Sequence, residues 1–469
     1  MQTTTDVAGV PTILSTPPAL QRVLAELSIA YREVIDHAGL DPACKVQAVL
    51  LNDSVGELMV LFPQSQLLDL NRLADLIGRD MTAVPADRLA GLLAKHSLRT
   101  LPGLPTVTGS TCLYEEHLLH QPMLFISSGE PGLLLEVTPE DFKCLLSKAS
   151  VGRFGEPLSA IRFSLRQAVD DGEAITRAVK AFTTRRIQQR LEATIELPPL
   201  AESVRKLIQF RANPDISIDE VTSVVETDPA LAAQLLSWAS SSYYAPKSKI
   251  RSVEDAISRV LGVDVVVNLA LSLSLDKSLG LPKDHPQASM PYWQQSIYTA
   301  AVIEGLTRAM PRDQRPEVGM TYLAGLLHNF GYLLLAHVFP PHFSLICRHL
   351  EVNSHASHSE IEQHLLGISR EQMGAWLMRF WGMPEELVTA VRFQHDPGYV
   401  GQDAPYPNLV CVALGLLRSR GMGHGSGAPL PDAIFERLGV TRDEGEAVVD
   451  KVLEAEALLR EMAALFSRA

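Results

Sequence analysis

The sequence predicts a multidomain protein in which an N-terminal mixed α/β domain is followed by an all-α helical bundle. The chain has 469 residues, which is too long for one ordinary core. Two hairpin patterns occur within the first 165 residues, whereas the regular patterns beyond residue 196 all have the helical period. These observations favour strands with helices in the first domain and helices alone in the second.

The patterns also predict where the domains begin and end. We expect a mobile N-terminus (1–18), an α/β domain (19–165), a connecting helix (166–195), an all-α domain (196–400) and a C-terminal helical extension (401–469). The N-terminus is rich in threonine and proline, which is typical of a mobile end. Because no Pro/Gly/Ser-rich linker separates the domains, we expect a semi-rigid helical connection.

The composition indicates the class of protein and its compartment. The chain is 46% hydrophobic and 20% charged, with a formal net charge of −13, which argues against general nucleic-acid binding and against anionic membranes. Five cysteines without a CxxC pair indicate reduced core residues. No stretch reaches 18 apolar residues without a charge or breaker, and the first residues lack a secretion signal. We therefore expect a cytoplasmic protein with no membrane span.

The α/β domain is predicted from two strand pairs. Strand patterns over 46–51 and 57–62 flank an Asn-Asp-Ser-Val-Gly loop, and a second pair over 123–127 and 133–137 flanks Ser-Gly-Glu-Pro-Gly. Helical spacing over 20–38 precedes the first pair.

Further helix signals lie between and after these hairpins. The ranges 67–78 and 85–96 have the helical period, with a short strand expected at 82–84. Thr138 followed by Pro139 predicts a helix start with a threonine N-cap.

Helix starts in the second half are marked by capping residues. They are Ser217, Asp228, Ser252 and Thr441. The helix after Thr441 either packs back on the bundle or forms a self-association face, so a homodimer is one alternative.

Two further helical patterns are expected in this half of the chain. A long one from Asp171 to Ile195 is either a basic face for an acidic partner or a solvated connecting helix, and we favour the second. Trp376, Phe380 and Trp381 recur at helical spacing, which favours core packing over a base-stacking platform.

About 200 residues of the second half resemble the HDOD domain, the output-domain branch of the HD superfamily. The resemblance is carried by Leu197–Leu200, Val225–Leu236, Ala239–Tyr243, Ile250–Ile257, Gly325–Gly331 and Glu362–Pro384. One departure is Ala239-Ser-Ser-Ser, where the family usually has an Asn-Ser pair. The resemblance implies a bacterial signalling and regulatory module that commonly lacks the hydrolase metal site.

Residues 20–165 resemble the YbaK-like domains associated with prolyl-tRNA synthetase, in the order of their elements and in the loop Leu101-Pro-Gly-Leu-Pro105. That family hydrolyses mischarged aminoacyl-tRNA, with a lysine in the first core strand and a glycine-rich substrate loop. Gln47 is expected at the lysine position, and a neutral amide cannot supply the lysine's charge. The resemblance therefore implies a former editing domain that serves binding or dimerisation.

The candidate site of the second domain centres on His328 and Asn329, within an apolar helical stretch over 323–335. The resemblance to HD phosphohydrolases implies a metal held by histidines and aspartates from separate helices. At those positions this sequence has a vestigial set: Gln295, His328, Asn329, Arg370, Gln394, His395 and Gly415.

Two imidazoles, two amides and a guanidinium do not suit a hard divalent cation, so no metal, cofactor or catalytic residue is expected. His328 is interpreted as a neutral core histidine hydrogen-bonded to a neighbouring amide. A weak metal ligand and a residue of a small-ligand pocket are the alternatives.

The predicted function is regulatory and non-catalytic, through binding of an unidentified protein partner or small signalling ligand. The alternatives are a metal-dependent phosphohydrolase with an altered HD site and aminoacyl-tRNA deacylation by the N-terminal domain.

Overall fold

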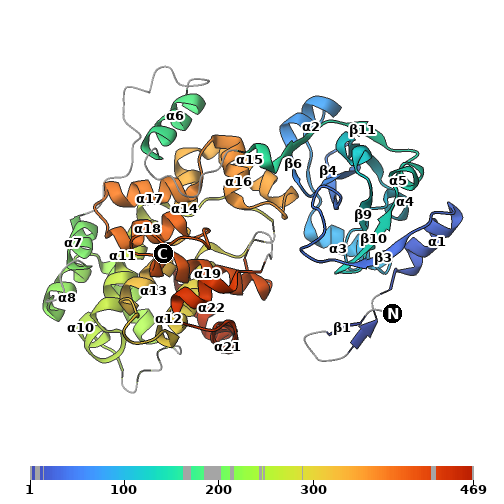
Figure 1. Cartoon of the computed structure of the whole chain (residues 1–469). Coiled ribbons are helices and arrows are strands. Elements are labelled where there is room, and N and C mark those ends of the chain that lie inside the picture. The colour runs from blue at the N-terminus through green and yellow to red at the C-terminus, as the bar shows by residue number, and fades with distance from the viewer. Residues whose placement is uncertain are drawn as a thin grey trace. The chain divides into compact units, whose positions relative to one another are not determined.

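The chain folds into two compact units. The computed structural model describes residues 3–5, 11–13, 15–161, 171–183, 202–211, 216–241, 244, 246, 249–287, 289–423 and 429–466. Unit 1 contains Met1–Arg162, Pro286–Ala288 and Leu345–Ile361, and unit 2 contains Phe163–His285, Ser289–Ser344 and Glu362–Ala469. Unit 1 is mixed α/β and unit 2 is helical among its described residues, which confirms the predicted fold class (Figure 1).

Both predicted hairpins are present in unit 1. Strands β4 and β5 pair antiparallel with Asn52 opposite Glu57, and β9 and β10 pair antiparallel with Val137 opposite Leu124. The strands of unit 1 are β1 (Thr3–Thr5), β2 (Pro11–Ile13), β3 (Arg32–Ile35), β4 (Val46–Asn52), β5 (Glu57–Pro63), β6 (Gln66–Leu68), β7 (Thr82–Ala83), β8 (Thr111–Glu115), β9 (Leu124–Ser127), β10 (Leu133–Val137), β11 (Ser150–Gly152) and β12 (Gly155–Pro157). They form a five-stranded sheet in the order β11-β8-β5-β4-β7, a three-stranded sheet β3-β10-β9, and the pairs β12-β6 and β1-β2.

The helices of unit 1 differ from the sequence prediction at two places. They are α1 (Pro18–Glu26), α2 (Leu70–Ile77), α3 (Ala86–Lys95), α4 (Pro105–Thr108) and α5 (Pro139–Leu145), with short 3-10 turns η1 (Glu116–His120) and η2 (Leu158–Ala160). The helix predicted over 20–38 ends earlier, at Glu26. Ser28 has a φ of 54°, which a helix does not allow, and the chain then enters β3. The pattern 67–78 begins in β6, whose pairing with the distant β12 no local pattern reveals. Thr138 caps α5 as predicted, accepting a bond from the Asp141 N–H.

A segment from the second half of the sequence completes unit 1. Residues Leu345–Ile361 belong to this unit, and Val352 is buried in a core cluster with Phe62, Leu68 and Leu73. The fully buried Asn353 accepts a hydrogen bond from the Leu68 N–H at 2.7 Å and donates one to the Leu68 carbonyl at 3.0 Å. One side chain therefore satisfies both backbone groups of a strand residue.

Two histidines of the same segment bond the neighbouring backbone. Nε2 of His349 accepts from the Leu70 N–H at 3.2 Å, and Nε2 of His355 donates to the Gln66 carbonyl at 2.8 Å. Side chains thus take the place of a neighbouring strand along β6, which would otherwise present unpaired backbone groups. The sequence analysis did not anticipate this role for residues 345–361.

Unit 2 is built from helices whose starts follow the predicted caps. Ser217 and Thr441 form complete capping boxes, Ser252 caps by accepting from the Asp255 N–H, and Asp228 accepts from the Leu231 N–H. The helices are α6 (Asp171–Thr183), α7 (Glu202–Arg211), α8 (Ile218–Glu226), α9 (Pro229–Ala239), α10 (Val253–Ala256), the π-turn η3 (Ile257–Leu261), α11 (Val263–Leu279), α12 (Tyr292–Ala309), α13 (Val318–Leu327), α14 (Phe330–Val338), α17 (Arg370–Phe380), α18 (Glu385–Phe393), α19 (Pro405–Ser419), α20 (Asp432–Leu438), α21 (Arg442–Glu454) and α22 (Glu456–Phe466). Helices α15 (Pro340–Val352) and α16 (His358–Leu366) each contain a division between the units.

Two sequence predictions are refined at the ends of unit 2. The pattern from Asp171 to Ile195 is helical from Asp171 to Thr183, and its remainder lies outside the described residues. The terminal pattern forms two helices, and α22 packs back on α12, where the Tyr298 hydroxyl donates to the Glu456 carbonyl at 3.4 Å. The terminal helix therefore packs back on the bundle, and its part in self-association stays a prediction.

Three glycines allow the central helices to approach closely. A Cβ on Gly325 of α13 would lie 2.5 Å from the Cα of Ala300 on α12. A Cβ on Gly331 of α14 would lie 1.9 Å from the Arg370 carbonyl oxygen, and Gly374 of α17 faces Gly331 at this crossing. Larger residues would separate these backbones, so the glycines place the first turn of α17 against the start of α14.

The helix predicted through His328 and Asn329 is interrupted at these two residues. Helix α13 ends at Leu327 and α14 begins at Phe330, with Asn329 at φ −100° and ψ 17°. Among the described residues, only the stretch Val318–Val338 is long and apolar enough to cross a membrane, and 83% of its apolar window is buried inside the fold. This stretch forms the core of unit 2.

Candidate functional site

His328 occupies the junction between α13 and α14. Nδ1 of the imidazole lies 2.7 Å from the Gly325 carbonyl oxygen, which can only accept, so Nδ1 carries the proton. Nε2 is then an acceptor, and it is buried without a hydrogen-bond partner in the described part of the chain. Burial lowers the pKa of His328 to about 4, and the nearby His395 and Arg370 act in the same direction. The lowered pKa favours the neutral form of the side chain, and its hydrogen bond goes to the backbone carbonyl of Gly325.

Arg370, at the start of α17, forms the charged centre of the site. Its Nε donates to Glu362 of α16 at 2.5 Å, and its backbone N–H donates to the other Glu362 oxygen at 2.8 Å. Nη1 donates to Oδ1 of Asn329 at 3.2 Å, and the guanidinium lies 5.1 Å from the centre of the Tyr332 ring. Arg370 is 5% exposed and Glu362 is fully buried, so each charge depends on the other.

The end of α18 supplies the remaining polar groups. The Gln394 amide donates to the His328 carbonyl at 2.8 Å and to the Val391 carbonyl at 3.1 Å. Next along the chain, Nε2 of His395 lies 3.4 Å from a carboxylate oxygen of the buried Glu371. Burial raises the pKa of Glu371, but the contact with His395 and the charge of Arg370 outweigh burial and hold the pKa below its usual range.

Five of the seven positions from the sequence analysis thus lie in one polar cluster, which we call the junction cluster: His328, Asn329, Arg370, Gln394 and His395. Two others have different surroundings. The three heavy atoms nearest to a Cβ on Gly415 of α19 would all belong to Leu430. Nε2 of Gln295 on α12 lies 3.9 Å from the place where a Cβ on Gly423 would be.

The sequence analysis did not identify two buried carboxylates that contact the junction cluster, Glu362 and Glu371. Both carboxylates lie within nine residues of Arg370 in the sequence. No local sequence pattern indicated that Glu362 contacts Arg370 or that Glu371 contacts His395.

The junction cluster does not have the donor set of a divalent metal site. The oxygen of the Asn329 carboxamide accepts a hydrogen bond from Arg370, while Glu362 is ion-paired with that same guanidinium. Among the described residues, no group of three or more His, Cys, Asp or Glu side chains is arranged to hold a metal. The Arg370 guanidinium near the buried Nε2 of His328 repels a doubly charged ion.

The buried His328 predicts a pH-dependent stability. Its folded pKa of about 4 lies below the 6.5 of an unfolded histidine, so its contribution is complete above pH 6.5 and is lost as the pH falls toward 4. The difference corresponds to about 3 kcal/mol of unfolding free energy. Urea unfolding at pH 7, 5.5 and 4.5 should show a smaller loss for His328→Leu than for the wild type.

The matched control is His37→Leu, which changes an exposed histidine of unit 1. It should keep the wild-type pH dependence. Equal acid sensitivity of the wild type and His328→Leu would contradict the assignment of this loss to His328.

In unit 1, Gln47 lies half-buried on β4 opposite Phe62. The sequence analysis overlooked Lys45, two residues earlier in the same extended stretch, where alternation places its side chain on the same face. The Lys45 ammonium is 14% exposed and lies 2.7 Å from a carboxylate oxygen of Asp36. Period-two alternation could have revealed this cation, and whether Gln47 or Lys45 holds the editing position stays a prediction.

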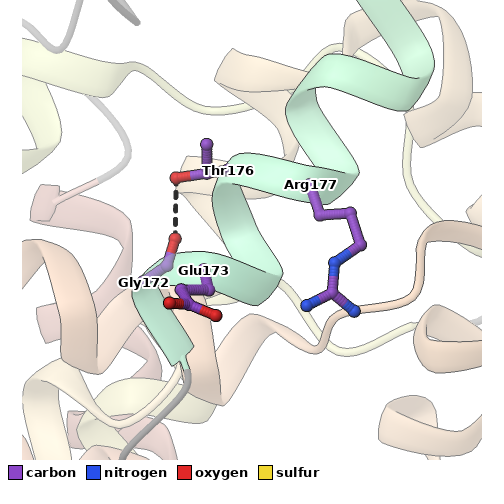
Figure 2. A pocket seen from close by; sticks show the side chains of 4 residues that line it. All are labelled: Gly172, Glu173, Thr176 and Arg177. Atoms are coloured by element: carbon purple, nitrogen blue, oxygen red, sulfur yellow. Dashed lines mark hydrogen bonds between the residues drawn. The ribbon is translucent and has the colours of Figure 1, made fainter.

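A shallow hollow of about 380 Å³ lies along α6 and is separate from the junction cluster. Figure 2 shows its described lining, Gly172, Glu173, Thr176 and Arg177, with the Thr176 hydroxyl donating to the Gly172 carbonyl at 2.7 Å. The hollow is largely open, so it does not have the form of a closed ligand cavity.

Two family models match the chain. One described as the HDOD domain matches residues 197–397, and one described as the aminoacyl-tRNA editing domain matches residues 29–145. A solved structure from Marinobacter aquaeolei VT8, described as a candidate signal transduction protein, is 40% identical with a TM-score of 0.91, covering 97% of this chain and 100% of that chain.

Two more distant relatives are similar over part of the chain. An HDOD domain protein of unknown function from Geobacter sulfurreducens is 20% identical with a TM-score of 0.50, covering 63% of this chain and 98% of its own, and shows a likeness of fold alone. An uncharacterized protein of Treponema pallidum (strain Nichols) is 22% identical over 243 residues, or 49% of this chain. This chain spans 45% of the length of that relative. The matches over both halves lead to one conclusion: the chain belongs to the HDOD family and carries an aminoacyl-tRNA editing (YbaK-like) domain ahead of its HDOD domain.

Proposed function

We propose that this HDOD protein regulates by binding a protein partner or small signalling ligand, without metal-dependent hydrolysis at the HD position. One observation carries the proposal. Arg370, itself paired with Glu362, donates to the Asn329 oxygen at 3.2 Å, at the position where an HD hydrolase would use a carboxylate to hold metal. The site keeps its helices but has the neutral amide of Asn329 in place of the anionic ligand, and the cation Arg370 bonds that amide.

The charges of the junction cluster disfavour metal-dependent hydrolysis. A divalent ion gains its attraction from carboxylate oxygens, and a bound water becomes a nucleophile only when that ion is held firmly. In the junction cluster the Glu362 carboxylate is neutralised by Arg370, and Asn329 and Gln394 contribute only neutral amides. The likeness to a candidate signal transduction protein over nearly the whole chain agrees with a regulatory role.

The proposal predicts that the purified full chain contains less than about 0.1 divalent metal ion per molecule after ordinary dialysis, because the carboxylates beside the two imidazoles are already paired, Glu362 with Arg370 and Glu371 with His395. Elemental analysis by mass spectrometry measures this directly. Hydrolysis of cyclic dinucleotides with added Mn²⁺ should stay at background. His328→Ala and the exposed-site control His37→Ala should give the same values as the wild type.

Stoichiometric metal together with turnover that disappears in His328→Ala and persists in His37→Ala would defeat the proposal. That result would establish the alternative of a metal-dependent phosphohydrolase with a rebuilt site.

Aminoacyl-tRNA deacylation is a second candidate, and Lys45 is the observation that favours it. Its partly buried ammonium supplies the cation that Gln47 lacks, although Asp36 neutralises it in this structure. The test uses the full chain, because residues 345–361 are part of unit 1. Release of amino acid from mischarged tRNA that is lost in Lys45→Ala and retained in Gln47→Ala would establish this activity.

The compartment and assembly are also proposals. A cytoplasmic location is supported by the five free cysteines, four of which are buried. Self-association remains part of the proposal, although α22 is used inside unit 2.

A further inference from the structure

Burial is described for residues 171–179 of helix α6. Three of these residues are buried, Asp171, Ile175 and Ala178, and the others are half-buried or exposed. Because the apolar contact of this first part of α6 is small, a strong polar contact at its start contributes a large share of the energy that holds it.

That contact is the carboxylate of Asp171. Its Oδ2 accepts from Nε of Arg392 at 2.6 Å, and its Oδ1 accepts from Nη2 of Arg392 at 3.2 Å and from the Gln372 amide at 2.8 Å. Arg392 is 2% exposed and Asp171 is 6% exposed. The two partners come from separate helices, α18 and α17, and they form what we call the carboxylate-docking site.

The docking site is prearranged by its own helices. Gln372 is the third residue of α17, where its side-chain oxygen accepts from the Ser369 N–H in the capping box, so its amide nitrogen is directed outward. The Arg392 guanidinium lies 5.2 Å from the centre of the Phe393 ring. Gly172, next to Asp171, would bring a Cβ within 3.7 Å of the Trp376 indole nitrogen, so the start of α6 also lies beside an aromatic residue.

We infer that Gln372 and Arg392 form a binding site for a carboxylate at the start of a helix, that α6 occupies this site through Asp171, and that α6 is displaceable from it. When Asp171 leaves, water reaches Arg392, so the docked and released states can both exist without a buried unpaired charge. The inference concerns α6 and does not depend on the proposed function.

The docking site shares its two helix ends with the junction cluster. The first three residues of α17 are Arg370, Glu371 and Gln372; the first two serve the cluster and the third serves Asp171. On the other helix end, Arg392 bonds Asp171 and Gln394 bonds His328. A partner or ligand that shifts these helix ends therefore changes the hydrogen bonds that Gln372 and Arg392 donate to Asp171 of α6. Helix α6 is the first described element after the α/β domain in the sequence.

Hydrogen exchange of the full chain tests the inference with a matched pair of variants. Asp171→Asn and Glu173→Gln each remove one negative charge from the first turn of α6, but Glu173 is exposed and Asp171 is the residue that binds Arg392. We expect amide exchange over residues 175–179 to accelerate about tenfold or more in Asp171→Asn and less than about twofold in Glu173→Gln. Amides of α12 and α13 should keep their protection in both variants, which reports that unit 2 is folded.

A third variant keeps the test decisive if Asp171→Asn affects the whole unit. Gln372→Ala removes one donor to Asp171, together with the capping-box bond from the Ser369 N–H, and leaves the Arg392 pair, so it should accelerate the same amides by an intermediate factor. Unchanged exchange of α6 in both Asp171→Asn and Gln372→Ala overturns the inference. Equal acceleration in Asp171→Asn and Glu173→Gln overturns it as well, because the helix dipole and not the docking site would then hold α6.

Discussion

Replacing Asn353 with leucine is expected to lower the unfolding free energy of unit 1 by about 3 kcal/mol, because two buried backbone groups of Leu68 lose their partners. Leucine has the same branching and the same number of side-chain heavy atoms as asparagine, so the change leaves no empty cavity and the loss of hydrogen bonds is the main effect. Asn353 also donates to the His349 carbonyl at 3.0 Å, and this bond is lost too. The loss should be largest at β6 and β12, the strands beside the substitution.

Hydrogen exchange of the β6 and β12 amides, followed in urea, measures this local stability. Asn71→Leu is the matched control, since it makes the same exchange of side chains at an exposed position of α2. If the two variants unfold at the same urea concentration, the Asn353 side chain does not have the role assigned to it.

Replacing Arg370 with methionine should have an effect of similar size in unit 2. The change leaves the Glu362 carboxylate fully buried without its cation, which costs about 3–5 kcal/mol when one partner of a buried ion pair is removed. Burial already raises the pKa of Glu362 to about 7, with Arg370 acting in the opposite direction. Without Arg370 the pKa rises further, so the folded variant takes up a proton.

The sign of the pH dependence follows from this uptake. A carboxyl with a folded pKa above its unfolded value is most favourable at low pH, and it destabilises the fold as the pH rises. Arg370→Met should therefore be less destabilised at pH 5 than at pH 8 in urea unfolding of the full chain. The control is Arg379→Met, also on α17, whose partner Glu385 is half exposed.

A double variant separates the ion pair from the rest of the site. Arg370→Met with Glu362→Leu should recover most of the stability, because no charge is then left buried alone. A double variant as unstable as the sum of the two single changes would show that the pair is not the cause.

The elements that follow local rules could be predicted from the sequence. The hairpins β4-β5 and β9-β10 and the caps at Thr138, Ser217 and Thr441 depend on residues that are neighbours along the chain. The resemblance to the HD superfamily also led to His328, Asn329 and Arg370, which the structure brings into one cluster.

What could not be predicted depends on contacts between residues far apart. Asp171 and Arg392 are 221 positions apart, and Leu68 and Asn353 are 285 apart. Side chains such as Asn353 and His349 look like ordinary polar residues of a helix until the strand that they bond is known. The interruption at His328 and Asn329 was missed because the apolar period continues across it.

The position of residues 345–361 within unit 1 has a consequence for how such proteins arise by recombination. The boundary that family resemblance draws between the editing and HDOD halves separates unit 1 from one of its own segments. A gene fragment that encodes only the first half omits Val352 and Asn353 from the core that it must form. We therefore expect the two halves to be inherited together, with substitutions along β6 compatible with a stretch encoded almost 300 codons downstream.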